Sequence, residues 1–147
     1  MDKEVLKIAL EFNSPVVDSE KEQRHVADAL NKIYVESFDN GALGNVLESM
    51  GESHKKLGGL KRLQRILELT FPETEVSSLM APLFVLYDLR VAYSHLGSEK
   101  GKNRRIQSIK ERLSLVGQFD FIAVYKKIVQ ELADSYKTLD ALFKTNT

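Results

Sequence analysis

Residues 77–97 read SSLMAPLFVLYDLRVAYSHLG, and this stretch decides the fold class. Ser77 or Ser78 is expected to cap a helix that has Pro82 in or near its first turn and that ends at Gly97. A helix that is apolar on nearly all sides usually lies at the centre of its domain. We therefore predict a central helix whose apolar positions are Leu79, Leu83, Phe84, Val85, Leu86, Leu89 and Ala92.

The segments before this helix also follow the helical period. Ser19 and Glu22 form a capping-box pattern, which predicts a helix that stops near Asn40-Gly41. Residues 43–50 predict a short helix, and residues 51–59, with three glycines, predict a loop. A further helix is expected from residue 60 to just before Pro72, because proline disfavours helix in the residue before it.

Two helices are expected after the central one. Asn103 should cap the first, after a polar loop over residues 97–103, and Gly117 should end it. Asp120 should cap the last and longest helix. Its apolar seam is typical of a bundle helix or a short coiled coil, with Ile122, Tyr125, Val129, Leu132, Tyr136, Leu139 and Phe143 spaced by three and four.

The pattern contains no β-hairpin signal and no internal repeat, so the predicted fold is all-α, an up-and-down bundle of about five main helices. Residues 3–12 place Val5, Ala9 and Phe12 on one stripe, and Asn13-Ser14-Pro15 ends that segment. We therefore divide the chain into an N-terminal helix and linker over residues 1–18 and a helical domain over residues 19–147.

Composition narrows the function classes. The 147 residues are 43% hydrophobic and 29% charged, which suits one domain with its own core. The chain has no cysteine, which excludes disulfides, thiolate nucleophiles and Cys-ligated zinc. No signal-peptide pattern follows Met1 and no apolar stretch is long enough to cross a bilayer, so we expect a cytoplasmic protein with no membrane association. The formal net charge is zero, so any nucleic-acid function depends on local basic patches.

The central helix also carries the candidate chemistry, Arg90 and His95 in an apolar context. Arginine can hold a phosphate and stabilise the charge that develops on it, and histidine can act as acid or base near neutral pH. Together they are the minimum set for cleaving a phosphodiester without a metal. On an ideal helix they lie about 140° apart and about 7.5 Å apart along the axis, whereas Ser94 shares the face of Arg90. The helix must therefore unwind near Ser94, or the pair must meet around a bound phosphate or across a dimer.

The segment Leu89-Arg90-x4-His95, followed by Leu-Gly, resembles the R-x4-6-H signature of HEPN domains, the "higher eukaryotes and prokaryotes nucleotide-binding" helical domains. In helix order the resemblance covers roughly residues 19–144, although only these few residues are specific. It implies a HEPN-like helical bundle acting as a metal-independent endoribonuclease. Such proteins occur in toxin–antitoxin and antiphage systems and form their active site between two identical subunits.

The resemblance also implies residue roles. His95 would be the general acid/base and Arg90 the contact to the phosphate and transition state, while the 2′-hydroxyl of the RNA attacks and leaves a cyclic phosphate. The family usually has a polar residue directly after the arginine, and this chain has Val91. Ser94 or Tyr93 is the candidate for the missing hydrogen bond. The alternative interpretation is structural, with His95 at a helix dipole and Arg90 paired with a core carboxylate.

Two basic groups are candidates for steering an RNA backbone. The group that follows the motif is assigned to RNA binding and comprises Lys100, Lys102, Arg104 and Arg105. The other comprises Lys55, Lys56, Lys61, Arg62 and Arg65. The alternative for each is a solvated surface. No aromatic residues are interleaved with these charges, so a stacking platform for single-stranded bases is not indicated.

Neither a metal nor a cofactor is expected. Glu22-x-x-His25 matches half of a di-iron helix motif, and the second half is missing. The first hypothesis is therefore a homodimeric HEPN-type RNA endonuclease, with RNA as substrate and an antitoxin or a larger defence protein as partner. The second is a non-catalytic HEPN-like dimerisation or partner-binding module of a larger defence or regulatory system, motivated by Val91 and the neutral net charge. An unrelated helical adaptor is the third.

Overall fold

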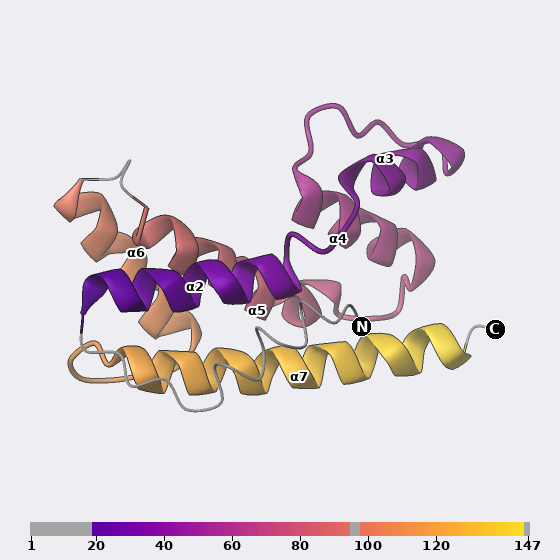
Figure 1. The fold of residues 1–147 in the computed structure, drawn as a ribbon. Coiled ribbons are helices and arrows are strands. Elements are labelled where there is room, and N and C mark those ends of the chain that lie inside the picture. The colour runs from indigo at the N-terminus through magenta and orange to yellow at the C-terminus, as the bar shows by residue number, and fades with distance from the viewer. Residues whose placement is uncertain (1–18, 95–97, 146–147) are drawn as a thin grey trace.

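The computed structural model describes residues 19–94 and 98–145, and over these residues the fold is all-α, as predicted (Figure 1). The segment predicted as an N-terminal helix and linker lies outside the described residues. Six helices and no strand occur in the described ranges. They are α2 (Glu20–Tyr34), α3 (Asn40–Ser49), α4 (Gly59–Thr70), α5 (Val76–Ala92), α6 (Glu99–Arg112) and α7 (Phe121–Thr145). None of them is long and apolar enough to cross a membrane.

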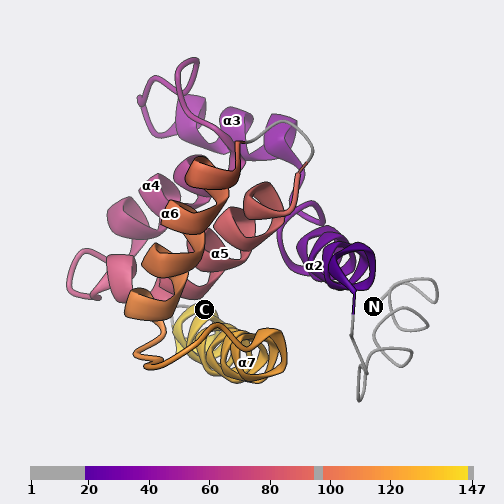
Figure 2. The same cartoon turned by 90° about the vertical axis from the view of Figure 1, so that its left-hand side faces the viewer.

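Helix α5 is the centre of the packing, which confirms the prediction for this stretch. It contacts α2, α4, α6 and α7, and nine of its 17 residues are buried (Figure 2). Met80, Leu83, Leu86 and Leu89 are completely inaccessible to solvent. Because neighbours surround α5 on several sides, its apolar side chains need not be confined to one stripe.

Both predicted ends of the central helix were wrong. The helix starts at Val76 with Glu75 as its N-cap, rather than after a cap at Ser77 or Ser78, because Val76 itself belongs to the core. It ends at Ala92 instead of Gly97. The Tyr93 N–H bonds to the carbonyl of Arg90, and the Ser94 N–H bonds to that of Val91. Such three-residue bonds tighten the last turn and close the helix.

Helix α2 was also shorter than predicted. The predicted cap is confirmed, because the Glu22 N–H donates to Ser19 Oγ at 3.2 Å. The helix ends at Tyr34 rather than near Asn40, since the N–H groups of Val35 and Glu36 both turn back to the Asn31 carbonyl. The predicted stop at Asn40 is instead where α3 begins.

Helix α6 begins earlier than predicted. Ser98 is its cap, accepting a bond from the Gly101 N–H at 3.0 Å, so the prediction of a cap at Asn103 and a loop up to it was wrong. At the other end, Ser114 takes the left-handed conformation, with φ of 57°. The Leu115 N–H reaches back to the Lys110 carbonyl, as in a Schellman motif, and ends the helix before Gly117.

Helix α7 has its predicted cap but a shifted seam. Asp120 Oδ1 accepts from the N–H groups of Ile122 and Ala123. Of the predicted seam, Leu132 and Leu139 are buried, and Tyr125, Val129 and Tyr136 pack partly buried against the core. Ile122, at 37% exposed, lies outside it, whereas Phe143 is 48% exposed but meets the Phe71 ring edge-on at 5.1 Å. The most buried stripe adds positions that were not predicted, namely Phe121, Val124, Ile128 and Ser135.

Helices α3 and α4 form a separate segment at one end of the molecule (Figure 1). They pack on each other, and α4 joins them to α5. Helix α4 buries Leu60, Leu63, Ile66 and Leu67, whereas α3 buries only Gly44 and Leu47. The predicted loop between the two helices is confirmed over residues 50–58.

Candidate functional site

Arg90 lies in the last turn of α5, and its side chain leaves the apolar interior instead of being buried in it. The side chain is 43% exposed and faces α2. Its Nε lies 3.6 Å from Asp28 Oδ1 and its Nη2 lies 3.9 Å from Glu36 Oε1. Both distances are too long for a good hydrogen bond. Within the described residues the guanidinium therefore has two charged neighbours while its N–H donors are not engaged.

Arg90 lines a groove of about 610 Å³ between the end of α2, the α3–α4 segment and α5. Its apolar lining includes Val35, Phe38, Leu60, Phe84 and Tyr87, and its polar lining includes Asn31, Glu36, Asn40, Lys56, Lys61 and Asp88. Small-molecule sites commonly have this volume and this combination of aromatic surface with a few polar groups. The groove, rather than Arg90 alone, is the candidate site.

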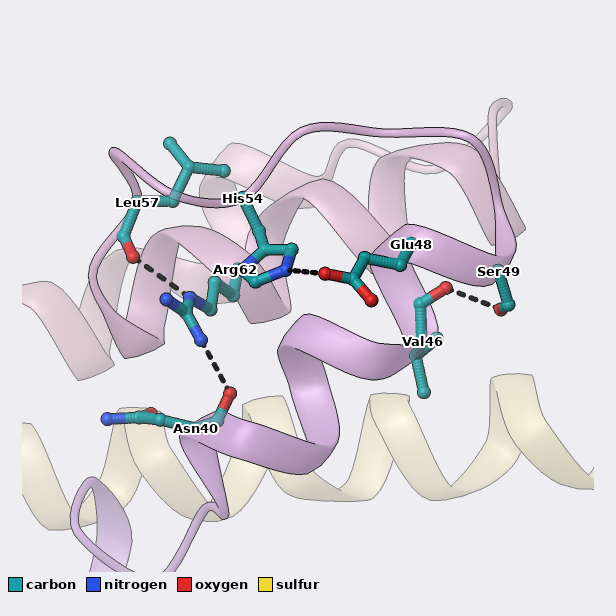
Figure 3. Close-up of polar contacts among 7 residues, drawn as sticks. All are labelled: Asn40, Val46, Glu48, Ser49, His54, Leu57 and Arg62. Carbon is teal, nitrogen blue, oxygen red and sulfur yellow. Dashed lines mark hydrogen bonds and ion pairs between the residues drawn. The ribbon is translucent and has the colours of Figure 1, made fainter.

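The rim of the groove on the α3–α4 side is held by polar contacts (Figure 3). Arg62 donates to the carbonyl of Leu57 at 2.9 Å and to that of Asn40 at 2.7 Å. These bonds tie the loop and the start of α3 to α4. Because Lys56 lies directly before Leu57 in the chain, Arg62 also keeps Lys56 at the rim.

The same loop closes onto α3 through His54. Its Nε2 lies 2.7 Å from Glu48 Oε1, and its Nδ1 is buried without a partner among the described residues (Figure 3). Gly44 allows this approach, because a Cβ there would come within 2.9 Å of His54 Cε1. A larger residue here would displace the His54 ring and the Arg62 guanidinium, so close packing favours glycine.

In the second basic group, over residues 55–65, the two arginines are paired with groups of the described chain and the three lysines are not. Arg62 is committed to two carbonyls, and Arg65 Nη2 pairs with Glu52 Oε1 at 3.0 Å. Lys55, Lys56 and Lys61 are exposed and have no ion pair in the described part of the chain. Lys56 and Lys61, which line the groove, are therefore its available cations on this side.

Tyr93 and Ser94 lie away from the groove that Arg90 lines. Tyr93 is 3% exposed, its hydroxyl donates to Gln23 Oε1 at 2.6 Å, and burial raises its pKa. Its carbonyl accepts from Arg24 Nε at 2.9 Å. Ser94 is exposed and lines a smaller hollow of about 190 Å³ beside Tyr93. This arrangement gives Tyr93 a packing role and does not bring either side chain to Arg90.

His95 lies outside the described residues, so its relation to Arg90 remains a prediction. The predicted RNA-binding group is split. The Lys102 ammonium pairs with Glu20 and lies 4.7 Å from the centre of the Tyr93 ring, while Arg105 is 3.6 Å from Asp88 Oδ1. Lys100 and Arg104 are exposed on α6 and have no ion pair with a described residue.

Sequence reasoning missed the partners of Arg90. Asp28 and Glu36 are ordinary surface carboxylates in the sequence, and nothing in their spacing points to an arginine more than 50 positions away. The sequence did hold a signal that Asn31 is special, because it occupies a position on the apolar stripe of α2. In the structure it is 2% exposed. A polar residue on such a stripe usually has a specific partner. Among the described residues no three His, Asp or Glu side chains gather as a metal site.

Comparison of the chain with protein-family models, with curated proteins and with solved structures gives no match.

Proposed function

We propose that the chain is a metal-independent RNA endonuclease of HEPN type, with an up-and-down HEPN-like arrangement of its main helices and an active site completed at a homodimer interface. The observation that carries the proposal is the guanidinium of Arg90, which is partly exposed with unengaged N–H donors on the wall of a groove rimmed by Lys56 and Lys61. An arginine in this setting can bind a phosphate through two parallel N–H bonds.

The end of α5 supports the pairing of Arg90 with His95. An unbroken helix would hold the two residues about 140° apart around its axis. The α-helix ends at Ala92, and the tight turn at Tyr93 and Ser94 already departs from that regular geometry. This corresponds to the expectation that the helix unwinds near Ser94.

The proposed reaction needs only groups of the protein and the RNA. His95 accepts the proton of the 2′-hydroxyl, whose oxygen attacks the adjacent phosphorus while the bond to the 5′-oxygen breaks. A protonated imidazole, supplied by the second copy, donates a proton to the leaving 5′-oxygen. Arg90 stabilises the negative charge on the phosphoryl oxygens. The products are a 2′,3′-cyclic phosphate and a 5′-hydroxyl.

The test is cleavage of end-labelled RNAs of mixed sequence in EDTA. His95→Ala and Arg90→Ala should each lower the rate by about 100-fold or more, the usual contribution of a positioned acid/base or charge-stabilising group. Lys137→Ala is the control, because its side chain is exposed on α7 and does not line the groove. Intact RNA after incubation with micromolar wild-type protein would contradict the proposal.

The setting of this activity is part of the proposal. We infer a cytoplasmic toxin or antiphage nuclease, whose partner is an antitoxin or a larger defence protein. Lys100 and Arg104 on α6 would contribute to holding the RNA backbone, since neither is paired with a described residue.

A second candidate function is a non-catalytic HEPN-like dimerisation or partner-binding module of a larger defence or regulatory system. The observation that favours it is the pair Asp28 and Glu36, whose carboxylates lie within 4 Å of Arg90 and partly neutralise it. Val91 after the arginine points the same way. This candidate predicts a dimer or a stable complex that His95→Ala leaves unchanged in analytical ultracentrifugation, together with no RNA cleavage.

A further inference from the structure

Asn31 and Glu36 form one wall of the Arg90 groove. Asn31 is 2% exposed, and among the described residues its Oδ1 has no hydrogen-bond partner. The amide orientation follows from its other end, because Nδ2 donates to Glu36 Oε1 at 3.3 Å. A flipped amide would oppose its oxygen to a carboxylate. Because Oδ1 is itself buried, Asn31 acts on a groove ligand through its Nδ2, which holds the carboxylate of Glu36 at the groove wall.

Glu36 supplies the acceptors that a ligand in the groove can reach. Its side chain is 51% exposed, and an ionised carboxylate has about four acceptor sites, of which Asn31 uses one. The adjacent groove wall carries the aromatic side chains of Phe84 and Tyr87. The local surface therefore favours a flat ring that offers N–H donors at its edge, with negative charge directed to Arg90, Lys56 and Lys61.

We propose that the groove binds a guanine base, so that the nuclease prefers a guanosine beside the phosphate held by Arg90. Guanine offers two adjacent donors, N1–H and the 2-amino group, that match one carboxylate. Adenine and cytosine place a ring-nitrogen acceptor beside their amino group, which would face the carboxylate of Glu36. Uracil offers one N–H between two carbonyl acceptors. The phosphate contact rests on the proposed function, whereas recognition of the base can be measured without cleavage.

The test is calorimetric titration of the wild-type protein with 5′-GMP, 5′-AMP, 5′-CMP and 5′-UMP. We expect 5′-GMP to bind about tenfold more tightly than the other three, the usual discrimination of one bidentate contact. Inosine 5′-monophosphate, which lacks the 2-amino group, should bind with intermediate affinity. Equal affinity for the four nucleotides, or no binding at millimolar concentration, would overturn the proposal.

The variant Glu36→Gln tests whether Glu36 is the residue that selects guanine. The variant should bring the ratio of GMP to AMP affinity close to one, because the amide presents a donor where the carboxylate presented an acceptor. Glu73→Gln is the matched control, since it makes the same charge change at an exposed position outside the groove. Arg90→Ala should weaken the binding of all four nucleotides by a similar factor and leave the ratio of GMP to AMP affinity unchanged. The melting temperature shows whether the Glu36→Gln variant is folded. If the folded variant kept the wild-type ratio of GMP to AMP affinity, the assignment of Glu36 would be contradicted.

The two proposals fail in different ways. If the protein cleaved RNA without base preference and bound the four nucleotides equally, the guanine site would be contradicted and the proposed nuclease activity would stand. If the protein preferred 5′-GMP but cleaved no RNA, the guanine site would stand and the proposed nuclease activity would be contradicted. Mapping the cleaved positions by primer extension on the same mixed-sequence RNAs distinguishes these results.

Discussion

Helix α5 and the α3–α4 segment are held in place by different forces. Nine of the 17 residues of α5 are buried, whereas α3 buries only Gly44 and Leu47. The connection between α3 and α4 depends on polar contacts, chiefly the bonds from Arg62 to two backbone carbonyls. The candidate groove lies between these two regions, so one of its walls belongs to a packed core, while its rim belongs to α3 and the loop before α4, which bury few apolar side chains. Such regions open at a lower free energy than the core.

The largest effect is expected in the core. Leu86→Ala removes a completely buried side chain from α5 and should lower the free energy of unfolding by about 3 kcal/mol, as lost burial and a residual cavity add. Val116→Ala, at a position that is 95% exposed, should change it by less than about 0.5 kcal/mol. Urea denaturation measures both. If Leu86→Ala lowered the free energy of unfolding as little as Val116→Ala does, α5 would not be the main source of stability.

A smaller and more local effect is expected in the α3–α4 segment. Arg62→Ala should cost about 2 kcal/mol, because two carbonyls lose a charged donor. Hydrogen exchange should accelerate in residues 40–58 while the amides of α5 keep their protection. Arg62→Lys keeps the charge without the forked geometry and should recover only part of the loss. Equal acceleration in α5 and α3 would mean that the two regions unfold as one unit.

The smallest effect at neutral pH is expected where α7 meets the end of α2. Tyr136 donates its hydroxyl to the Tyr34 carbonyl at 3.0 Å, so Tyr136→Phe should cost about 1 kcal/mol. Burial, with a smaller contribution from Tyr34, raises the pKa of Tyr136 to about 12.

The raised pKa makes the effect of Tyr136→Phe depend on pH. Between about pH 10 and pH 12 the folded state keeps a proton that the unfolded state has lost, so the stability of the wild type falls as pH rises. The variant lacks this group, so the difference between the two proteins should shrink over the same range in thermal melts. A constant difference up to pH 12 would contradict the raised pKa.

The sequence predicted the element types better than their ends. Helical periodicity identified the helices, and the caps at Ser19 and Asp120 were correct because such a cap is a bond within three or four residues of the chain. The ends at Ala92 and Arg112 were missed because neither has a residue type that signals a stop. Ser114 takes the left-handed position that is normally expected of glycine.

For the candidate site, the sequence singled out Arg90 but not what surrounds it. The alternative interpretation paired it with a core carboxylate, whereas the two carboxylates near it are about half exposed. Its partners, Asp28 and Glu36, are brought to it by the packing of α2 on α5. Tyr93 and Ser94, which one-dimensional spacing had grouped with Arg90, follow the end of α5 at Ala92 and line a different hollow.

By itself, the sequence determined that the chain is all-α and that the stretch around Leu86 lies at its centre, because periodicity and caps depend on neighbours three or four residues apart. Only the tertiary structure decided which face of α7 is buried, which lysines and arginines remain available, and which carboxylates face Arg90. Those outcomes depend on contacts between residues that are distant in the chain, and such contacts form only when whole helices pack.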